Sequence, residues 1–373
     1  MEILNKTYNT RKILSRWKWV ILGILSLGVR WLAAYTPQSV EAIYSRGIYP
    51  IIRWVFDISL AFSPIPLIYL FYAIIFYFII KTIAFQFKKS IPLSIRLKEN
   101  AFSVLSFAGF MVFWFLFLWG YNYARVPFQK QMNIDVSKLD SISLEKELII
   151  AANDAINARV KLNTIESIPL SISKAIPMEK PNFEDKIRRD ISKMLQNNGF
   201  KAGGNLRGRG LTPDGILFRF GISGIYMPYV GESNIDGGMH PLEKPFTMAH
   251  EMAHGYGWTD EATANFVAYL TCIGSDDAFT QYSGYLMYFR YVASNYRRIN
   301  TEGYKKFRET LPIGMVNDLK AINARIEQFP TWFDTEGLNN VFLKSQGVKE
   351  GIASYSRVVT LVYSWRLKLN QLK

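Results

Sequence analysis

Long apolar runs dominate the first third of the chain, and they constrain its fold more than any other feature. Residues 60–80 and 101–124 form stretches of 21 and 24 positions without a charged side chain. Because an α-helix needs about 20 apolar residues to cross a bilayer, both stretches are long enough. An earlier run, 17–35, carries Lys18 and Arg30 near its ends, where long cationic side chains reach the membrane interfaces. We therefore predict three transmembrane helices, at about 17–35, 64–84 and 101–122.

The first apolar run has an alternative interpretation as a cleaved signal peptide, which requires small residues at a cleavage site after the apolar core. The segment RWLAAYTP supplies Ala33 and Ala34, but Trp and Tyr residues flank them. This pattern fits a retained membrane anchor better than a cleavage site.

Lysine and arginine residues are distributed unevenly beside the predicted spans, and this bias indicates orientation. Four basic residues precede the first span, and five lie between the second and third spans. The connection after the first span has only two basic residues, and Glu41 and Asp57 offset their charge. Since basic flanks stay in the cytoplasm, we predict a cytoplasmic N-terminus. The chain then divides into a membrane domain at 1–124 and an extracytoplasmic domain at 125–373.

The net charge of +14 follows partly from this topology, because residues 1–121 hold 13 basic and 4 acidic side chains. We therefore predict no nucleic-acid partner. The segment KAGGNLRGRG, residues 201–210, is predicted to be a glycine-rich surface turn. The single cysteine, Cys272, excludes both an internal disulfide and a cysteine-rich zinc cluster, and its apolar neighbours predict a small core residue.

The extracytoplasmic part is predicted to be an α+β domain that is mainly helical with a small sheet. Two amphipathic helices, 144–160 and 182–195, precede LTPDGILFRFGISGIYMPYVGESNID, whose short apolar runs and glycines indicate strands and turns. The pattern is helical again over 246–369, with breaks near Gly274, Asn300, Pro312 and Gly337. The aromatic connection at 36–63 is predicted to lie on the outer membrane surface.

The segment TMAHEMAHGYGWTDEATANF contains two of the three histidines of the chain, His250 and His254. Residues four apart share one face of a helix, so both imidazoles can reach one zinc ion at about 2.0–2.1 Å. Glu251 lies between them and is placed to act as general base toward a water that zinc acidifies. This is the H-E-x-x-H arrangement. No other charge occurs between residues 247 and 260, so the helix is predicted to be buried.

A third metal ligand has two candidates. Asp260 completes H-E-x-x-H-x-x-G-x-x-D, the spacing typical of metzincins, but the segment around Met287 lacks the tight methionine turn of that class. Glu261 instead opens the apolar helix EATANFVAYL, and gluzincins take their third ligand from a glutamate on a following helix. We favour Glu261, with Asn265 one turn further on as a partner that orients a ligand.

The segments GIYMPYVGESNID and PFTMAHEMAHGYGWTDEATANFVAYL, behind three apolar runs, resemble bacterial membrane proteins catalogued as domain of unknown function 3810. That family is classed by its H-E-x-x-H helix as candidate zinc metallopeptidases. Its active helix is followed by G-(aromatic)-x-x-E-x-x-A-N-F, and the matching residues here are Gly257, Trp258, Glu261, Ala264, Asn265 and Phe266. The resemblance implies zinc as cofactor and Glu261 as third ligand, and it implies no particular substrate.

Peptidases of this kind need a strand for the substrate and a donor for the oxyanion. The segment GILFRFGISGIYMP is the candidate edge strand, to which an extended peptide can add. Tyr226, His240 and Tyr355 are candidate oxyanion donors. Tyr355 is preferred because its segment, SYSRVV, also resembles the family.

The sequence therefore predicts a zinc metalloendopeptidase anchored in the bacterial cytoplasmic membrane, with its catalytic domain outside, the bilayer as one partner and a peptide or protein as substrate. The alternative is a membrane-anchored binding or scaffold protein that retains a zinc site. An intramembrane protease is disfavoured, since the motif lies far from the spans in a polar setting. A transporter is disfavoured because three spans without a midplane charge offer no ion path.

Overall fold

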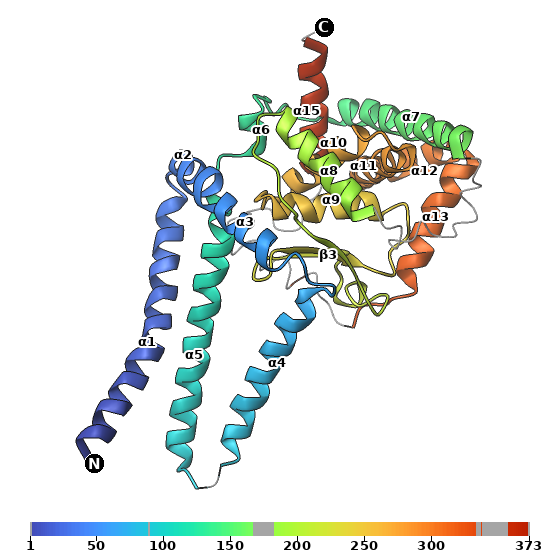
Figure 1. Cartoon of the computed structure of the whole chain (residues 1–373). Coiled ribbons are helices and arrows are strands. Elements are labelled where there is room, and N and C mark those ends of the chain that lie inside the picture. Colours follow the sequence, from blue (N-terminus) through green and yellow to red (C-terminus); the bar gives the residue numbers. More distant parts are fainter. Residues whose placement is uncertain (1, 89, 167–182, 333–336, 338–356, 372–373) are drawn as a thin grey trace. The chain divides into compact units, whose positions relative to one another are not determined.

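The computed structural model describes residues 2–88, 90–166, 183–332, 337 and 357–371. The chain is mainly helical with one small three-stranded sheet, which confirms the predicted fold class. Contacts divide it into two compact units (Figure 1). Unit 1 comprises Met1–Val126 with Met227–Val230, and unit 2 comprises Pro127–Tyr226 with Gly231–Lys373.

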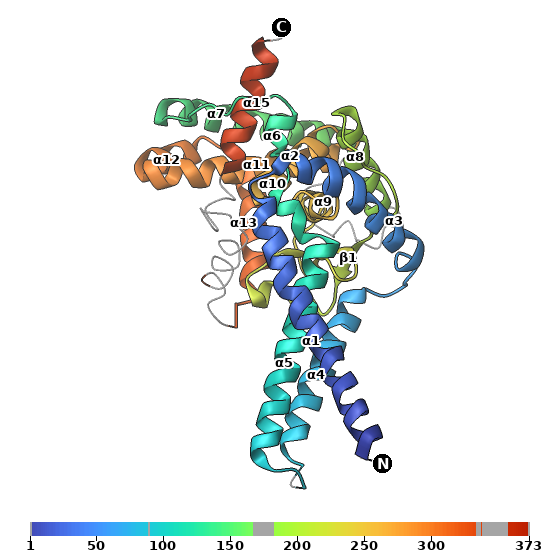
Figure 2. The same ribbon diagram turned by 90° about the vertical axis from the view of Figure 1, so that its left-hand side faces the viewer.

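Unit 1 contains three long helices: α1 (Glu2–Ala33), α4 (Leu67–Gln86) and α5 (Leu93–Leu118). Helices α1 and α5 run side by side in both views (Figures 1 and 2). Glycines bring them together, because a Cβ on Gly23 would lie 2.8 Å from the Cα of Gly109. Small residues at a helix interface permit such close backbone approach. Helices α4 and α5 are each long and apolar enough to cross a membrane.

The connection between α1 and α4 is itself helical, with α2 (Pro37–Ser39), the π-helix η1 (Val40–Ile48) and α3 (Tyr49–Ser59). Residues Trp17–Ala33 of α1 and Pro37–Ser59 of the connection are long and apolar enough to cross a membrane only when taken together. The two segments are bent by 113° relative to each other. The described residues therefore hold two, or up to three, candidate spans. The predicted place of 36–63 on the outer membrane surface stays a prediction.

The charged side chains of this connection are paired within unit 1. Arg53 and Asp57 form a buried ion pair of 2.8 Å on one face of α3, whereas Ile51 and Trp54 are exposed on another. The rest of unit 1 comprises η2 (Gly120–Ala124) and residues 227–230. In the latter segment the ring of Tyr229 stacks on Phe71 with centroids 4.7 Å apart.

Unit 2 begins with α6 (Phe128–Gln131), α7 (Ser141–Glu166) and α8 (Phe183–Asn197), so both predicted amphipathic helices are confirmed. The sheet follows, with β1 (Gly208–Leu211), β2 (Gly224–Met227) and β3 (Glu232–Asp236) in the order β1-β3-β2. Strands β1 and β3 are parallel, with Gly208 opposite Ser233. A 3-10 turn, η3 (Phe218–Phe220), precedes β2.

Two sequence predictions in this region are wrong in part. Residues 208–210 do not belong to a surface turn but open β1, because Gly208 lets the strand approach helix α9 (Lys244–Gly255) where a Cβ would overlap Met248 and Met252. Within GILFRFGISGIYMP, only Gly224–Met227 forms a strand. Some glycines of this segment, such as Gly224, permit close packing, and others, such as Gly221 with its positive φ, form turns. Amino-acid composition alone does not distinguish these two uses.

The described residues of the C-terminal part are mainly helical, as predicted, and the breaks near Gly274, Asn300 and Pro312 are confirmed. The predicted break near Gly337 borders residues that the structure does not describe, so it stays a prediction. Every residue of α9 is buried, which confirms the prediction from its missing charges. Cys272 is also fully buried, as predicted. The helices of this part among the described residues are α9 (Lys244–Gly255), α10 (Glu261–Ile273), α11 (Ala278–Ile299), α12 (Thr301–Glu309), α13 (Ile313–Glu327) and α15 (Val358–Gln371).

Candidate metal centre

Helix α9 presents His250 and His254 one turn apart, and the turn after it returns the chain to the same place. The helix ends at Gly255, and the N–H of Trp258 donates to the carbonyl of Ala253 at 3.1 Å. Gly257 has a φ of 85°, in the left-handed region that glycine adopts without strain. The chain therefore reverses within five residues, and α10 begins beside α9.

The first residues of α10 separate the two candidate third ligands. Asp260 is the N-cap of the helix, and its carboxylate accepts hydrogen bonds from the N–H and hydroxyl of Thr263 at 2.9 and 2.8 Å. It also pairs with Arg357. Glu261 is the first helical residue, and its carboxylate points at the two histidines. The structure therefore brings Glu261 to the histidines and leaves the Asp260 carboxylate on the helix cap.

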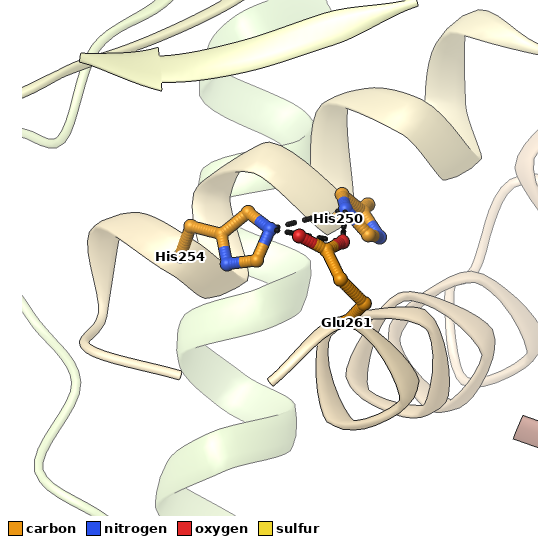
Figure 3. A group of neighbouring side chains, drawn as sticks. All are labelled: His250, His254 and Glu261. Atoms are coloured by element: carbon orange, nitrogen blue, oxygen red, sulfur yellow. Dashed lines mark hydrogen bonds and ion pairs between the residues drawn. The ribbon is translucent and has the colours of Figure 1, made fainter. Parts of the chain in front are cut away.

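Three possible ligand atoms converge between α9 and α10 (Figure 3). The Nε2 atoms of His250 and His254 lie 3.1 Å apart. One Glu261 carboxylate oxygen lies 3.2 Å from the first nitrogen and 3.5 Å from the second. All three residues are buried, at 6–9% exposure, so water does not readily solvate these atoms.

The far side of each imidazole is held by a hydrogen-bond acceptor. The Nδ1 of His254 donates to the carbonyl of Trp258 at 2.7 Å, since a carbonyl can only accept. The Nδ1 of His250 donates to the Oδ1 of Asn265 at 2.8 Å. The hydroxyl of Tyr291 donates to the same Oδ1 at 3.1 Å. These bonds fix both tautomers, because each neutral ring carries one proton, and they leave the lone pair of each Nε2 facing inward.

Two imidazole lone pairs and a carboxylate oxygen thus face one another in a buried space, and the oxygen is left without a hydrogen bond. Such acceptors repel one another unless a cation lies between them. Atoms bound to zinc at about 2.05 Å in tetrahedral geometry lie about 3.3 Å from one another. The observed separations of 3.1, 3.2 and 3.5 Å are close to this value. The described residues therefore fit a zinc ion held by two histidines and one carboxylate.

The charges of the cluster shift its own titration. Burial works against a charged His254, but the nearby Glu261 carboxylate outweighs it and raises the pKa of His254 to about 9. Burial works against a charged Glu261 as well, yet the two histidines lower its pKa far below the usual range. A positive charge in the middle of the cluster is therefore favoured, whether a proton or a metal ion supplies it.

Glu251 lies beside the cluster and is 5% exposed. Burial raises the pKa of its carboxyl to about 7, although the neighbouring histidines and a hydrogen bond from the N–H of Tyr226 work in the opposite direction. A carboxyl with a pKa near neutrality can both accept and release a proton at physiological pH. This is the property required of a general base.

The other predicted residues are placed as follows. Asn265 holds His250, as expected of an orienting partner, and Tyr226 reaches Glu251 through its backbone. His240 accepts a hydrogen bond from the N–H of Leu242 through its Nδ1, and its charged neighbours are Asp318, Arg325, Arg290 and Lys244. It is thus surrounded by a set of charges other than the metal cluster. Tyr355 lies outside the described residues.

Two contributors were missed in the sequence. Tyr291 comes from α11 and gives no motif signal, because it lies 26 residues from the asparagine that it contacts. Trp258 contributes its carbonyl to His254, and its buried indole packs edge-on against Phe128 and Phe200, with ring centroids 4.6 and 5.0 Å away. The aromatic position of the G-(aromatic)-x-x-E pattern could have indicated such an anchor, since a packed ring fixes the backbone that carries it.

The family described as "Protein of unknown function (DUF3810)" matches residues 44–363, which is more than half of the chain. No curated protein and no solved structure matches.

Proposed function

We propose that this chain, which belongs to the DUF3810 family of proteins of unknown function, is a membrane-anchored zinc peptidase with Glu251 as general base. The observation that carries the proposal is the convergence of three buried acceptor atoms, from His250, His254 and Glu261, at separations that suit one zinc ion. The apolar helices of unit 1 support the membrane anchor. The basic flanks of the spans support an extracytoplasmic catalytic domain in a bacterial membrane.

The two Nε2 atoms and the Glu261 carboxylate would hold the ion. When bound, zinc supplies a Lewis acid that acidifies water and polarises a carbonyl group. Asn265 and the carbonyl of Trp258 keep both imidazoles in the tautomer that offers Nε2 to the metal. The ligand set carries one negative charge, which leaves the site with a net positive charge to attract a polarised carbonyl oxygen.

Glu251 accounts for the proton transfers. Its carboxylate accepts a proton from water as the water oxygen bonds to the carbonyl carbon of the scissile peptide. The same proton then passes to the amide nitrogen as the carbon–nitrogen bond breaks, and the second proton of the water ends on the released amine, so the products are a carboxylate and an ammonium group. No covalent acyl-enzyme forms, because water is the nucleophile.

Strand β2 supports an extended peptide as substrate. It pairs with β3 on one side and is an edge of the described sheet. An extended peptide can add to such an edge through main-chain hydrogen bonds, with limited demand on side-chain identity. The predicted edge strand is thereby narrowed to Gly224–Met227, whose backbone also contacts the general base.

The test uses the full chain purified in detergent, with zinc measured by mass spectrometry and hydrolysis followed on a library of quenched fluorescent peptides. Glu251→Gln should retain about one zinc per chain and lower the rate by about 10²–10⁴, the usual contribution of a general base. Glu302→Gln is the control, because this exposed α12 residue pairs only with Lys305 among the described contacts. A folded wild type without zinc would refute the proposal. Hydrolysis that survives Glu251→Gln would refute the role of the base.

A further inference from the structure

Strand β2 lies directly against the side chain of Glu251. A Cβ atom on Gly224 would lie 2.5 Å from Oε1 of Glu251, 2.7 Å from its Cγ and 2.8 Å from its Cδ. Gly224 is not among the glycines with positive φ, so its backbone conformation is open to any residue. The glycine is therefore required by the space that the glutamate occupies and not by a turn.

The same strand hydrogen bonds to the carboxylate. The N–H of Tyr226, two residues beyond Gly224, donates to the Glu251 carboxylate. Gly224 and Tyr226 thus both contact the glutamate, Gly224 by close approach and Tyr226 through its backbone N–H. One of these residues limits where the side chain can lie, and the other provides a directional bond.

Strand β3 holds the same glutamate through its main chain. The hydroxyl of Ser233 donates to the backbone carbonyl of Glu251 at 2.9 Å. The amide of Asn234 donates to the carbonyl of Ile225 at 3.4 Å and so connects β3 to β2. Ser233 and Asn234 are fully buried, which makes these bonds costly to lose. Both strands thus converge on one residue of α9.

We propose that Gly224, Tyr226 and Ser233 form a clamp that fixes the position of the Glu251 side chain beside the metal cluster, with Gly224 and Ser233 as positioning residues. The catalytic purpose of the clamp rests on the proposed function, whereas its existence rests only on these contacts. Ground-state placement of a general base matters because proton transfer requires hydrogen-bond distance to the water. A larger residue at position 224 would displace the carboxylate from that place.

A double-mutant cycle tests the clamp without an activity assay. Gly224→Ala in the wild type should lower the Tm of the zinc-loaded protein by about 3–10 °C, the range expected for overpacking in a domain of this size. Glu251→Ala removes the three atoms nearest to the new Cβ, so Gly224→Ala should lose at least half of its effect in that background. Glu251→Gln keeps the bulk of the side chain, so the full effect should persist there. Gly203→Ala is the matched control, because a Cβ there meets nothing within 4 Å.

The outcomes separate this proposal from the peptidase. Equal Tm shifts for Gly224→Ala in the wild type and in Glu251→Ala would overturn the clamp, whatever the activity. If Gly224→Ala fails to fold in the wild type, recovery of folded protein in the Glu251→Ala background supports the clamp, and failure in both refutes it. Absence of hydrolysis with an intact cycle would refute the proposed function and leave the clamp standing. If the wild type is active, Ser233→Ala should lower kcat, with a smaller change in KM and an unchanged zinc content.

Discussion

The assignment of Glu261 as the third ligand can be tested by substituting, one at a time, the two adjacent carboxylate residues Asp260 and Glu261. Glu261→Gln removes the charge from the centre of the cluster, where the carboxylate lies 3.2 and 3.5 Å from the two Nε2 atoms. Loss of a group that merely orients a ligand costs about 10–100-fold in metal affinity. Loss of a charged ligand should exceed that range, which corresponds to more than about 2.7 kcal/mol. The fold should survive, because an amide NH₂ in the same place can donate to the imidazole lone pairs.

Changes at Asp260 should have a different signature. Asp260→Ala removes the N-cap bonds to Thr263, which typically costs about 1 kcal/mol of stability. For a domain of this size the loss corresponds to a fall in Tm of about 2–4 °C. Asp260→Asn keeps an equally good cap and should change neither Tm nor zinc affinity appreciably. The exposed pairing with Arg357 adds little to these values.

Zinc affinity is measured by competition with a chromogenic chelator, and stability by the Tm of the zinc-loaded protein. The expected result is a loss of zinc in Glu261→Gln alone, together with a small fall in Tm in Asp260→Ala alone. If Asp260→Asn released the metal and Glu261→Gln retained it, the argument from the helix cap would be wrong, and the alternative metzincin-like ligand set would replace it.

Two further changes probe the surroundings of the cluster. Asn265→Ala should weaken zinc binding by about 10–100-fold, because His250 loses the acceptor that fixes its ring. Tyr291→Phe should weaken zinc binding less, because the Asn265 acceptor remains. Both affinities are measured by chelator competition, and a larger loss in Tyr291→Phe than in Asn265→Ala would contradict the reasoning. Burial lowers the pKa of His240 to about 4, so the unfolded chain binds a proton there between about pH 6.5 and 4 that the folded chain does not. The free energy of unfolding should therefore fall as the pH drops through this window. In urea titrations at pH 7.5 and 4.5, His240→Gln should show a smaller difference between the two free energies of unfolding than the wild type. An equal difference in both proteins would count against the role of His240.

The sequence could predict features that depend on local spacing. The i,i+4 pattern placed His250 and His254 on one face, and the absence of other charges predicted the burial of α9. The apolar runs predicted α4 within three residues at each end, whereas α5 begins eight residues before the predicted start at 101. These predictions succeed because one helix or one bilayer crossing determines them. Gly208 shows the limit, since its role depends on Met248 of a distant helix, and its sequence resembled a surface turn.

Contacts across long sequence separations carry the parts that could not be predicted. Tyr291 reaches Asn265 from another helix, and Ser233 reaches the backbone of Glu251 from a strand. Neither residue stands in a recognisable motif. Gly224 is hidden for a related reason, because nothing beside it in the predicted edge strand shows why a glycine is needed, whereas its neighbour in space is a glutamate 27 positions later.

The turn between α9 and α10 explains why an adjacent pair of carboxylates takes two different roles. The left-handed Gly257 and the bond from the N–H of Trp258 to Ala253 close α9, and the buried indole of Trp258 fixes the direction in which the chain leaves. Asp260 must then adopt the extended conformation of an N-cap, with its side chain folded back on the helix end. Glu261, as the first helical residue, is rotated away from that cap and toward α9. The choice of ligand is therefore made by backbone geometry before the metal contributes, and a residue inserted between Gly257 and Asp260 should abolish zinc binding even with all three ligands present.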